Sequence, residues 1–139
     1  MKVEYFNPPF LHAPVDNMYS HISVAASPGA VYRIGGQVPV DAIGKNVAVD
    51  DMPGQIRACY EFVSLSLEHL GLQWPSVTHL MIFTTRMDEY MEAEPKIAPG
   101  FFGQSPPPST LIGVSRLVDK AWMVEIQADA VGDPVEAGS

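Results

Sequence analysis

The sequence predicts a single α+β domain, in which a sheet of about five strands carries two helical segments on one face. Three observations lead to this fold class. Strand-like and helix-like segments alternate along the 139 residues, one long helical pattern is amphipathic, and one strand is apolar on both faces. A chain of this length can bury its own core, and we expect one domain.

The first strands are expected near the N-terminus. Tyr19–Ala26 and Ala30–Ile34 have strand composition and flank the turn signal SPG. This arrangement predicts a β-hairpin. We expect residues 1–18 to form a lead into a domain that spans residues 19–131.

The main helix has clear start and stop signals. Asp51 is a suitable N-cap and Pro53 lies in the first turn. Gly71 follows the last residue of the pattern and predicts the C-terminal end. Between these signals, apolar residues recur at steps of three and four: Ile56, Cys59, Tyr60, Val63, Leu67 and Leu70.

The second half of the chain alternates in the same way. Glu89–Phe102 has helical composition, but Pro95 and Pro99 allow only short or kinked helical pieces there. The tail, residues 132–139, is small and polar, and we expect it to fray. Three segments in this half are predicted to be strands: Val77–Thr85, Ser109–Val114 and Trp122–Val131.

The strand at 77–85 also predicts self-association. Leu80 and Ile82 point to one face, while Met81 and Phe83 point to the other. A strand that is apolar on both faces needs cover on both. Two helical segments cover only one face of such a sheet, so a second copy of the chain is expected against the other.

Composition argues against several classes of partner. The net charge is −8, the sequence pI is about 4.7 and the eight basic residues are scattered, so nucleic acid is not an expected partner. No apolar run reaches the ~18–20 residues of a membrane span. The N-terminus has no secretory pattern, and the single cysteine favours a reducing, cytoplasmic location.

The usual cofactor signals are missing from the sequence. His12, His21, His69 and His79 have no metal-ligand spacing, and no phosphate-loop motif occurs. Cys59 lies on the apolar stripe of the main helix, which favours a buried structural thiol. We therefore expect neither a metal nor another cofactor.

Glu125 is the candidate catalytic residue. In WMVEIQADAV, apolar residues alternate with a second set that contains Glu125. One interpretation is a half-exposed strand whose polar face meets water. The other is a partly desolvated carboxylate that positions water and transfers protons.

The stretch FFGQSPPPSTLIGVSRL has an unusual entry into its strand. Pro106, Pro107 and Pro108 cannot donate backbone hydrogen bonds and hold the chain extended. This rigid segment leads directly to the hydroxyl pair Ser109 and Thr110, which we expect at a ligand site.

Several segments, taken in order, resemble the reactive-intermediate deaminase family, also called RidA, YjgF, YER057c, UK114 or endoribonuclease L-PSP. The resemblance spans about residues 19–131. It implies a fold similar to chorismate mutase: a mixed sheet with two helices on one face, packed as a homotrimer around a central barrel with ligand clefts between subunits. The matching segments are GGQVPV, DMPGQIRACYEFVSLSLEHLGL, VTHLMIFTTRMDEYMEAEP, PPPSTLIGVSRL and MVEIQADAV.

The resemblance also implies an activity and roles for residues. The best-characterised family members hydrolyse enamines and imines released by pyridoxal-phosphate enzymes to a keto acid and ammonia. Carried over by position, the strand glutamate falls on Glu125, the glycine whose N–H meets the substrate on Gly36, followed by Gln37, and the early aromatic residue on Tyr19.

The chain departs from the family pattern P-x-R-[ST], whose arginine binds a substrate carboxylate. Counting back from GVSRL places Ser109 at that position, and counting forward from the prolines places Pro108 there. Whether Arg116 or Arg33 reaches the cleft instead is open. Two functions therefore stand beside each other: a hydrolase for a small reactive imine or enamine other than a typical 2-imino acid, and a non-catalytic small-molecule binder.

Overall fold

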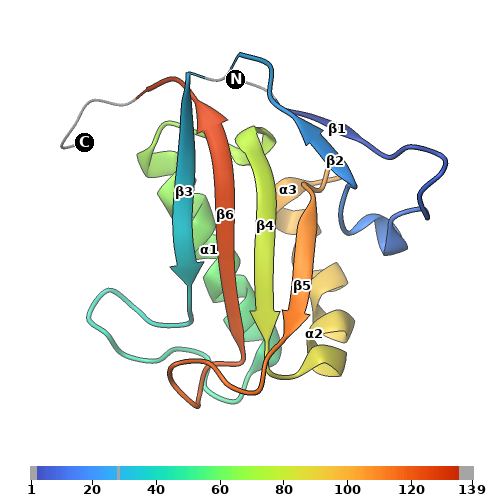
Figure 1. The fold of residues 1–139 in the computed structure, drawn as a ribbon. Coiled ribbons are helices and arrows are strands. Elements are labelled where there is room, and N and C mark those ends of the chain that lie inside the picture. The colour runs from blue at the N-terminus through green and yellow to red at the C-terminus, as the bar shows by residue number, and fades with distance from the viewer. Residues whose placement is uncertain (1–2, 28, 135–139) are drawn as a thin grey trace.

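The computed structural model describes residues 3–27 and 29–134. Its centre is a four-stranded sheet with the strand order β3-β6-β4-β5. The helices lie together behind this sheet, and the face toward the viewer in Figure 1 carries none. The α+β prediction, with helices on one face of a mixed sheet, is confirmed. The strands are β3 (Ala30–Gln37), β4 (Val77–Thr84), β5 (Ser109–Gly113) and β6 (Val124–Gly132).

The sheet is mixed because only one of its strand pairs is parallel. β6 runs antiparallel to both β3 and β4, whereas β4 and β5 are parallel. A parallel neighbour requires a crossover connection, and here the crossover contains the second helical segment. This connection places that segment against the β4–β5 edge (Figure 1).

The main helix, α1 (Met52–His69), begins and ends at the predicted signals. The Asp51 side chain accepts a hydrogen bond from the Gly54 N–H at 3.0 Å. At the other end Gly71 has φ +71°, and the Leu72 N–H donates to the Leu67 carbonyl at 2.8 Å. This is a Schellman ending, in which glycine accepts the left-handed conformation without a Cβ penalty.

One apolar core joins α1 to the sheet. The buried side of α1 packs mainly on β6. Residues of β4 and β6 that face the helices alternate with residues on the other face, as the period of a strand requires. The fully buried members of this core include Ile56, Cys59, Tyr60, Val63, Val77, Leu80, Ile82, Val124, Ile126 and Ala130.

The prolines divide the second helical segment as expected. α2 (Met87–Ala93) is followed by a short 3₁₀ turn at Glu94–Lys96 and then by α3 (Pro99–Phe102). Pro95 lies in the first turn of the 3₁₀ piece and Pro99 begins α3, positions where the missing N–H is tolerated.

The predicted hairpin is wrong. β2 (Ile22–Val24) pairs antiparallel with β1 (Glu4–Phe6) in a separate two-stranded sheet, and β3 pairs with β6. The reason is burial: β2 has only three residues and leaves Ile22 and Val24 exposed, whereas β6 offers β3 a long partner with buried residues. Pro28 of the SPG turn lies outside the described residues.

The helix-free face of the sheet is only partly covered in one chain. Met81 and Phe83 on β4 are half-buried there, while Leu80 and Ile82 are buried toward the helices. The two-faced character of this strand is therefore present in the fold. Of the tail, residues 135–139 lie outside the described residues. Among the helices that the structure describes, none is long and apolar enough to cross a membrane.

Candidate functional site

Glu125 and Gly36 form a close pair on the helix-free face of the sheet. The register of β3 against β6 shifts between Ile34 and Gln37, which leaves Gly36 within an irregular segment. A Cβ built on Gly36 would lie 2.7 Å from the Glu125 Cδ. Only glycine lets the carboxylate occupy this place, so the fold holds the candidate catalytic group directly against the predicted backbone donor.

The predicted ligand residue Gln37 follows this pair. Its side-chain amide donates to the Gly35 carbonyl at 3.0 Å, which closes the irregular turn of β3 on itself. Gln37 thus supports the local backbone on which Gly36 sits.

Ser109 and Thr110 lie on opposite faces of the sheet. Side chains alternate along β5, so Thr110 points to the helix-free face of the sheet. There its hydroxyl forms a hydrogen bond with His79 Nε2 at 3.1 Å. Ser109 faces the helix side, where it lines a pocket together with Leu111. One chain therefore does not bring both hydroxyls to the same place.

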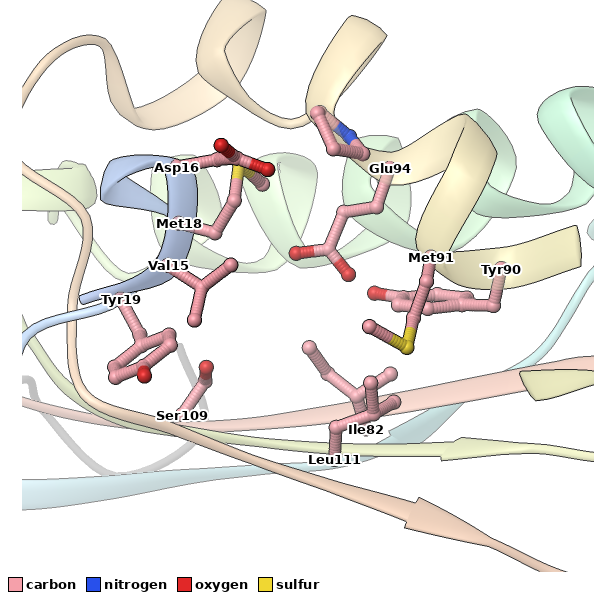
Figure 2. Close-up of a pocket in the computed structure, with 11 residues that line it drawn as sticks. Val15, Asp16, Met18, Tyr19, Ile82, Tyr90, Met91, Glu94, Ser109 and Leu111 are labelled. Atoms are coloured by element: carbon pink, nitrogen blue, oxygen red, sulfur yellow. The ribbon is translucent and has the colours of Figure 1, made fainter. Parts of the chain in front are cut away.

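The pocket on the helix side has a volume of about 220 Å³. Its wall comes from the segment around the 3₁₀ turn η1 (Val15–Asn17), from β4 and β5, and from α2 and the turn after it (Figure 2). The pocket contains two of the predicted substrate residues, Tyr19 and Ser109. Most of the other lining side chains are apolar: Val15, Met18, Ile82, Met91, Pro95 and Leu111.

Tyr19 is fixed at the mouth of this pocket by histidines. Its hydroxyl lies 2.7 Å from His12 Nε2, and His21 Nε2 donates to the His12 carbonyl at 2.6 Å. The three rings pack edge to face. These contacts fix the orientation of the Tyr19 ring, the one aromatic side chain that was predicted from the sequence to bind substrate.

The pocket holds a buried carboxylate that the sequence reasoning missed. Glu94 is 8 % exposed, and its carboxylate points into the pocket, toward the Tyr90 hydroxyl (Figure 2). Burial raises the pKa of Glu94 from 4.5 to about 7, and the nearby Tyr90 hydroxyl opposes this shift only in part. Such a carboxyl group is close to half-protonated at neutral pH.

Two buried tyrosine hydroxyls lie close enough to Glu94 to be affected by its charge. Those of Tyr60 and Tyr90 are fully buried, and neither has a hydrogen-bond partner of good geometry among the described residues. Burial raises the pKa of both well above 10, with a further contribution from the Glu94 charge. Both are neutral at physiological pH.

A signal for Glu94 was present in the sequence. Tyr90, Ala93, Glu94 and Ile97 stand at i, i+3, i+4 and i+7, so the carboxylate occupies a position of the apolar stripe. A charged residue at such a position is expected to be buried, and it is a candidate for function.

The two arginines left open by the sequence do not line this pocket. Arg33 is 77 % exposed and forms an ion pair with Asp129 at 3.3 Å. Arg116 donates to the carbonyls of Leu117 and Val118 in its own loop.

Cys59 is a buried structural thiol, as its position on the apolar stripe indicated. Burial raises its pKa to about 12, with a smaller contribution from the Glu125 charge, and its Sγ lies 3.7 Å from the Val124 carbonyl. Within the part of the chain that the structure describes, no group of three or more His, Cys, Asp or Glu residues could hold a metal ion.

The model of the family described as Endoribonuclease L-PSP matches residues 10–132. The chain belongs to this family. A search of proteins with curated functions found no match.

Several solved structures share the fold. A Yersinia pestis protein of unknown function from the conserved Rid family, YyfB, has 23% identity and a TM-score of 0.85, with 94% of this chain and 99% of that chain covered. A Rhodopseudomonas palustris structure, described as a probable translation initiation inhibitor, has 23% identity and a TM-score of 0.68, covering 95% and 99%. A Mycobacterium tuberculosis member of the YjgF/YER057c/UK114 family has 22% identity and a TM-score of 0.62, covering 81% and 86%.

Proposed function

We propose that this Rid-family protein hydrolyses a small reactive imine, enamine or related intermediate, with Glu125 as the acid–base group. The observation that carries the proposal is the Glu125 carboxylate seated against Gly36 in the irregular segment of β3. A carboxylate beside such an irregular strand segment can hold a water molecule, while a backbone N–H of the segment orients the substrate.

The reaction needs few groups. An enamine first tautomerises to the imine. The imine is protonated on nitrogen, and water adds to its carbon as Glu125 accepts one water proton, which gives the neutral carbinolamine. Glu125 returns that proton to the nitrogen, the C–N bond breaks, and the hydroxyl proton passes to the departing ammonia. A carbonyl compound and an ammonium ion leave. General acid–base assistance of this kind contributes about 10²- to 10⁴-fold.

The proposal includes a homotrimer with the site between subunits. Glu125 and Gly36 lie toward the β3 side of the sheet, while Tyr19 and Ser109 lie at the β5 edge. A neighbouring copy that places its β3 side against this edge would join the two halves of the site. This assembly also supplies the cover that the helix-free face lacks.

A second candidate function is a non-catalytic small-molecule binder. The observation that favours it is the absence of Lys, Arg and His from the residues that line the described pocket. Without a guanidinium, the carboxylate of a bound molecule loses a charge-assisted pair worth roughly 1.5–3 kcal/mol. Typical 2-imino acids are therefore expected to be poor substrates of a hydrolase and poor ligands of a binder.

The test is hydrolysis of imines released in situ. An amine oxidase supplies imines without a carboxylate, an amino-acid oxidase supplies 2-imino acids, and carbonyl formation is followed with and without the protein. We expect acceleration with the first group, and its loss by about 10²- to 10⁴-fold in Glu125→Gln. Asp129→Asn, which changes a carboxylate on the same face of β6, is the control and retains activity. Full activity in Glu125→Gln would leave the binder as the better proposal.

A further inference from the structure

The charged residues that line the helix-side pocket are all acidic. Glu94 lies in its wall and Asp16 at its exposed mouth. Among the described residues, neither ion pair involves Glu94, since these join Arg33 to Asp129 and Arg86 to Glu89. A buried carboxylate without a counter-ion carries a large desolvation cost. A bound cation would supply the positive charge that this wall lacks.

A second buried polar group points to the same ligand. The Tyr90 hydroxyl is fully buried, has no hydrogen-bond partner of good geometry in the described part of the chain, and lines the pocket beside Glu94 (Figure 2). A neutral phenol can donate to the carboxylate and accept from an N–H group. The opposite wall adds the Ser109 hydroxyl, which can also accept from an N–H group.

The remaining walls limit the size and character of the ligand. They are apolar, and the volume of about 220 Å³ is below the ~300–1,000 Å³ of sites for drug-sized molecules. A small organic group with one polar end fits these walls. An anionic end would meet Glu94 and Asp16 with no basic side chain among the lining residues to offset their charge.

We propose that this pocket selects a small ligand with a cationic nitrogen, a protonated amine or an iminium ion, with Glu94 as the counter-ion and Tyr90 and Ser109 as hydrogen-bond partners. The inference rests on the proposed function for the reaction, because an iminium ion is the protonated, more electrophilic form of an imine. Hydrolysis then balances as R₂C=NH₂⁺ + H₂O → R₂C=O + NH₄⁺. Specificity for cations is thus a property of Glu94, while proton transfer belongs to Glu125.

The test is a binding experiment on the full chain that requires no turnover. Benzylamine, which is protonated at pH 7.5, and phenylacetate are similar in size and opposite in charge. Calorimetric titration of each into the protein should give an affinity for benzylamine at least tenfold higher than for phenylacetate. Glu94→Gln should lower the benzylamine affinity at least tenfold and narrow the difference between the two probes.

Glu92→Gln is the matched control, because Glu92 lies two residues before Glu94, in the last turn of α2, but is exposed and does not line the pocket. It should bind both probes as the unchanged protein does. Equal affinities, preference for phenylacetate, no binding of benzylamine, or an unchanged benzylamine affinity in Glu94→Gln would each overturn the inference. Imine hydrolysis that persists alongside any of these results would leave the proposed function standing and remove only the cation preference.

Discussion

Gly36 shows how a single missing side chain can define a site. A Cβ atom built on residue 36 would lie 2.7 Å from the Cδ of Glu125, in space that the Glu125 carboxyl group already fills. Because a carboxylate at the end of a flexible side chain can move, we expect Gly36→Ala to fold normally and to displace Glu125. Turnover of the imine substrate should fall at least tenfold, as misplaced catalytic groups lose rate steeply.

The preceding glycine provides the control. A Cβ on Gly35 has no atom within 4 Å, so Gly35→Ala adds a methyl group to open space in the same strand segment. Initial rates of both variants should be measured beside their thermal unfolding. Equal rates in Gly35→Ala and Gly36→Ala would show that the position of Glu125 does not matter for activity.

At the residue scale, the sequence predicted best which face of the sheet a side chain points to, because this follows from the two-residue period of a strand. It placed Glu125 on the polar face of its strand because residues two apart share a face. The same period separates Ser109 from Thr110, which stand next to each other in the sequence and face opposite sides. Glu94 was not predicted, because Pro95 and Pro99 divide its segment into short pieces and obscure the helical period that gives Glu94 a core position.

At the scale of elements, helix α1 depends on its N-cap. The Asp51 carboxylate accepts from the Gly54 N–H, one of the donors that the helix itself cannot satisfy. Asp51→Ala should therefore lower the free energy of unfolding by about 1 kcal/mol, within a range of roughly 0.5–2 kcal/mol. Urea unfolding followed by circular dichroism measures this change.

Asp51→Asn separates the cap from the charge. Asparagine retains a side-chain oxygen that can accept from the Gly54 N–H, and it ranks with aspartate as an N-cap. This variant should keep nearly all of the stability. A loss as large as that of Asp51→Ala would assign the effect to the charge at the helix N-terminus instead.

Helices and strands that have local sequence signals could be predicted, but which strand pairs with which could not. Cap, stripe and stop residues defined α1, and two prolines divided the segment after β4. The pairing of β2 with β1 depends on how much each alternative buries, which no local pattern reports. The turn signal between 26 and 30 favoured neighbouring strands, but burial against β6 determined the position of β3.

At the scale of the whole molecule, Glu94 should make stability depend on pH. Its pKa is raised from 4.5 to about 7 by burial, so between these values the folded protein keeps a proton that the unfolded chain has released. The free energy of unfolding therefore falls as the pH rises from about 4.5 to 7, by an amount on the order of 3 kcal/mol. Above that window the loss stays constant.

Glu94→Gln should remove this slope. The variant should match the unchanged protein near pH 4.5 and be more stable at pH 8, in urea unfolding at a series of pH values. The lowered pKa of Asp119 acts at more acidic pH, and the raised pKa values of Cys59 and Tyr90 act at more alkaline pH. Glu92→Gln, on the exposed side of the preceding helix α2, should retain the slope. Parallel profiles for Glu94→Gln and the unchanged protein would contradict the burial argument.

The assembly decides whether the two halves of the proposed site meet. The helix-free face presents Met81 and Phe83, half-buried in one chain, and packing three such faces together would remove them from water. Light scattering should give three times the chain mass of 15.1 kDa at micromolar concentration. Met81→Lys places a charge at the centre of that interface and should yield monomers, because an unpaired buried charge is costly. Leu65→Lys, on the exposed outer side of α1, should remain trimeric. A monomer in the unchanged protein would contradict both the trimer and the site between subunits.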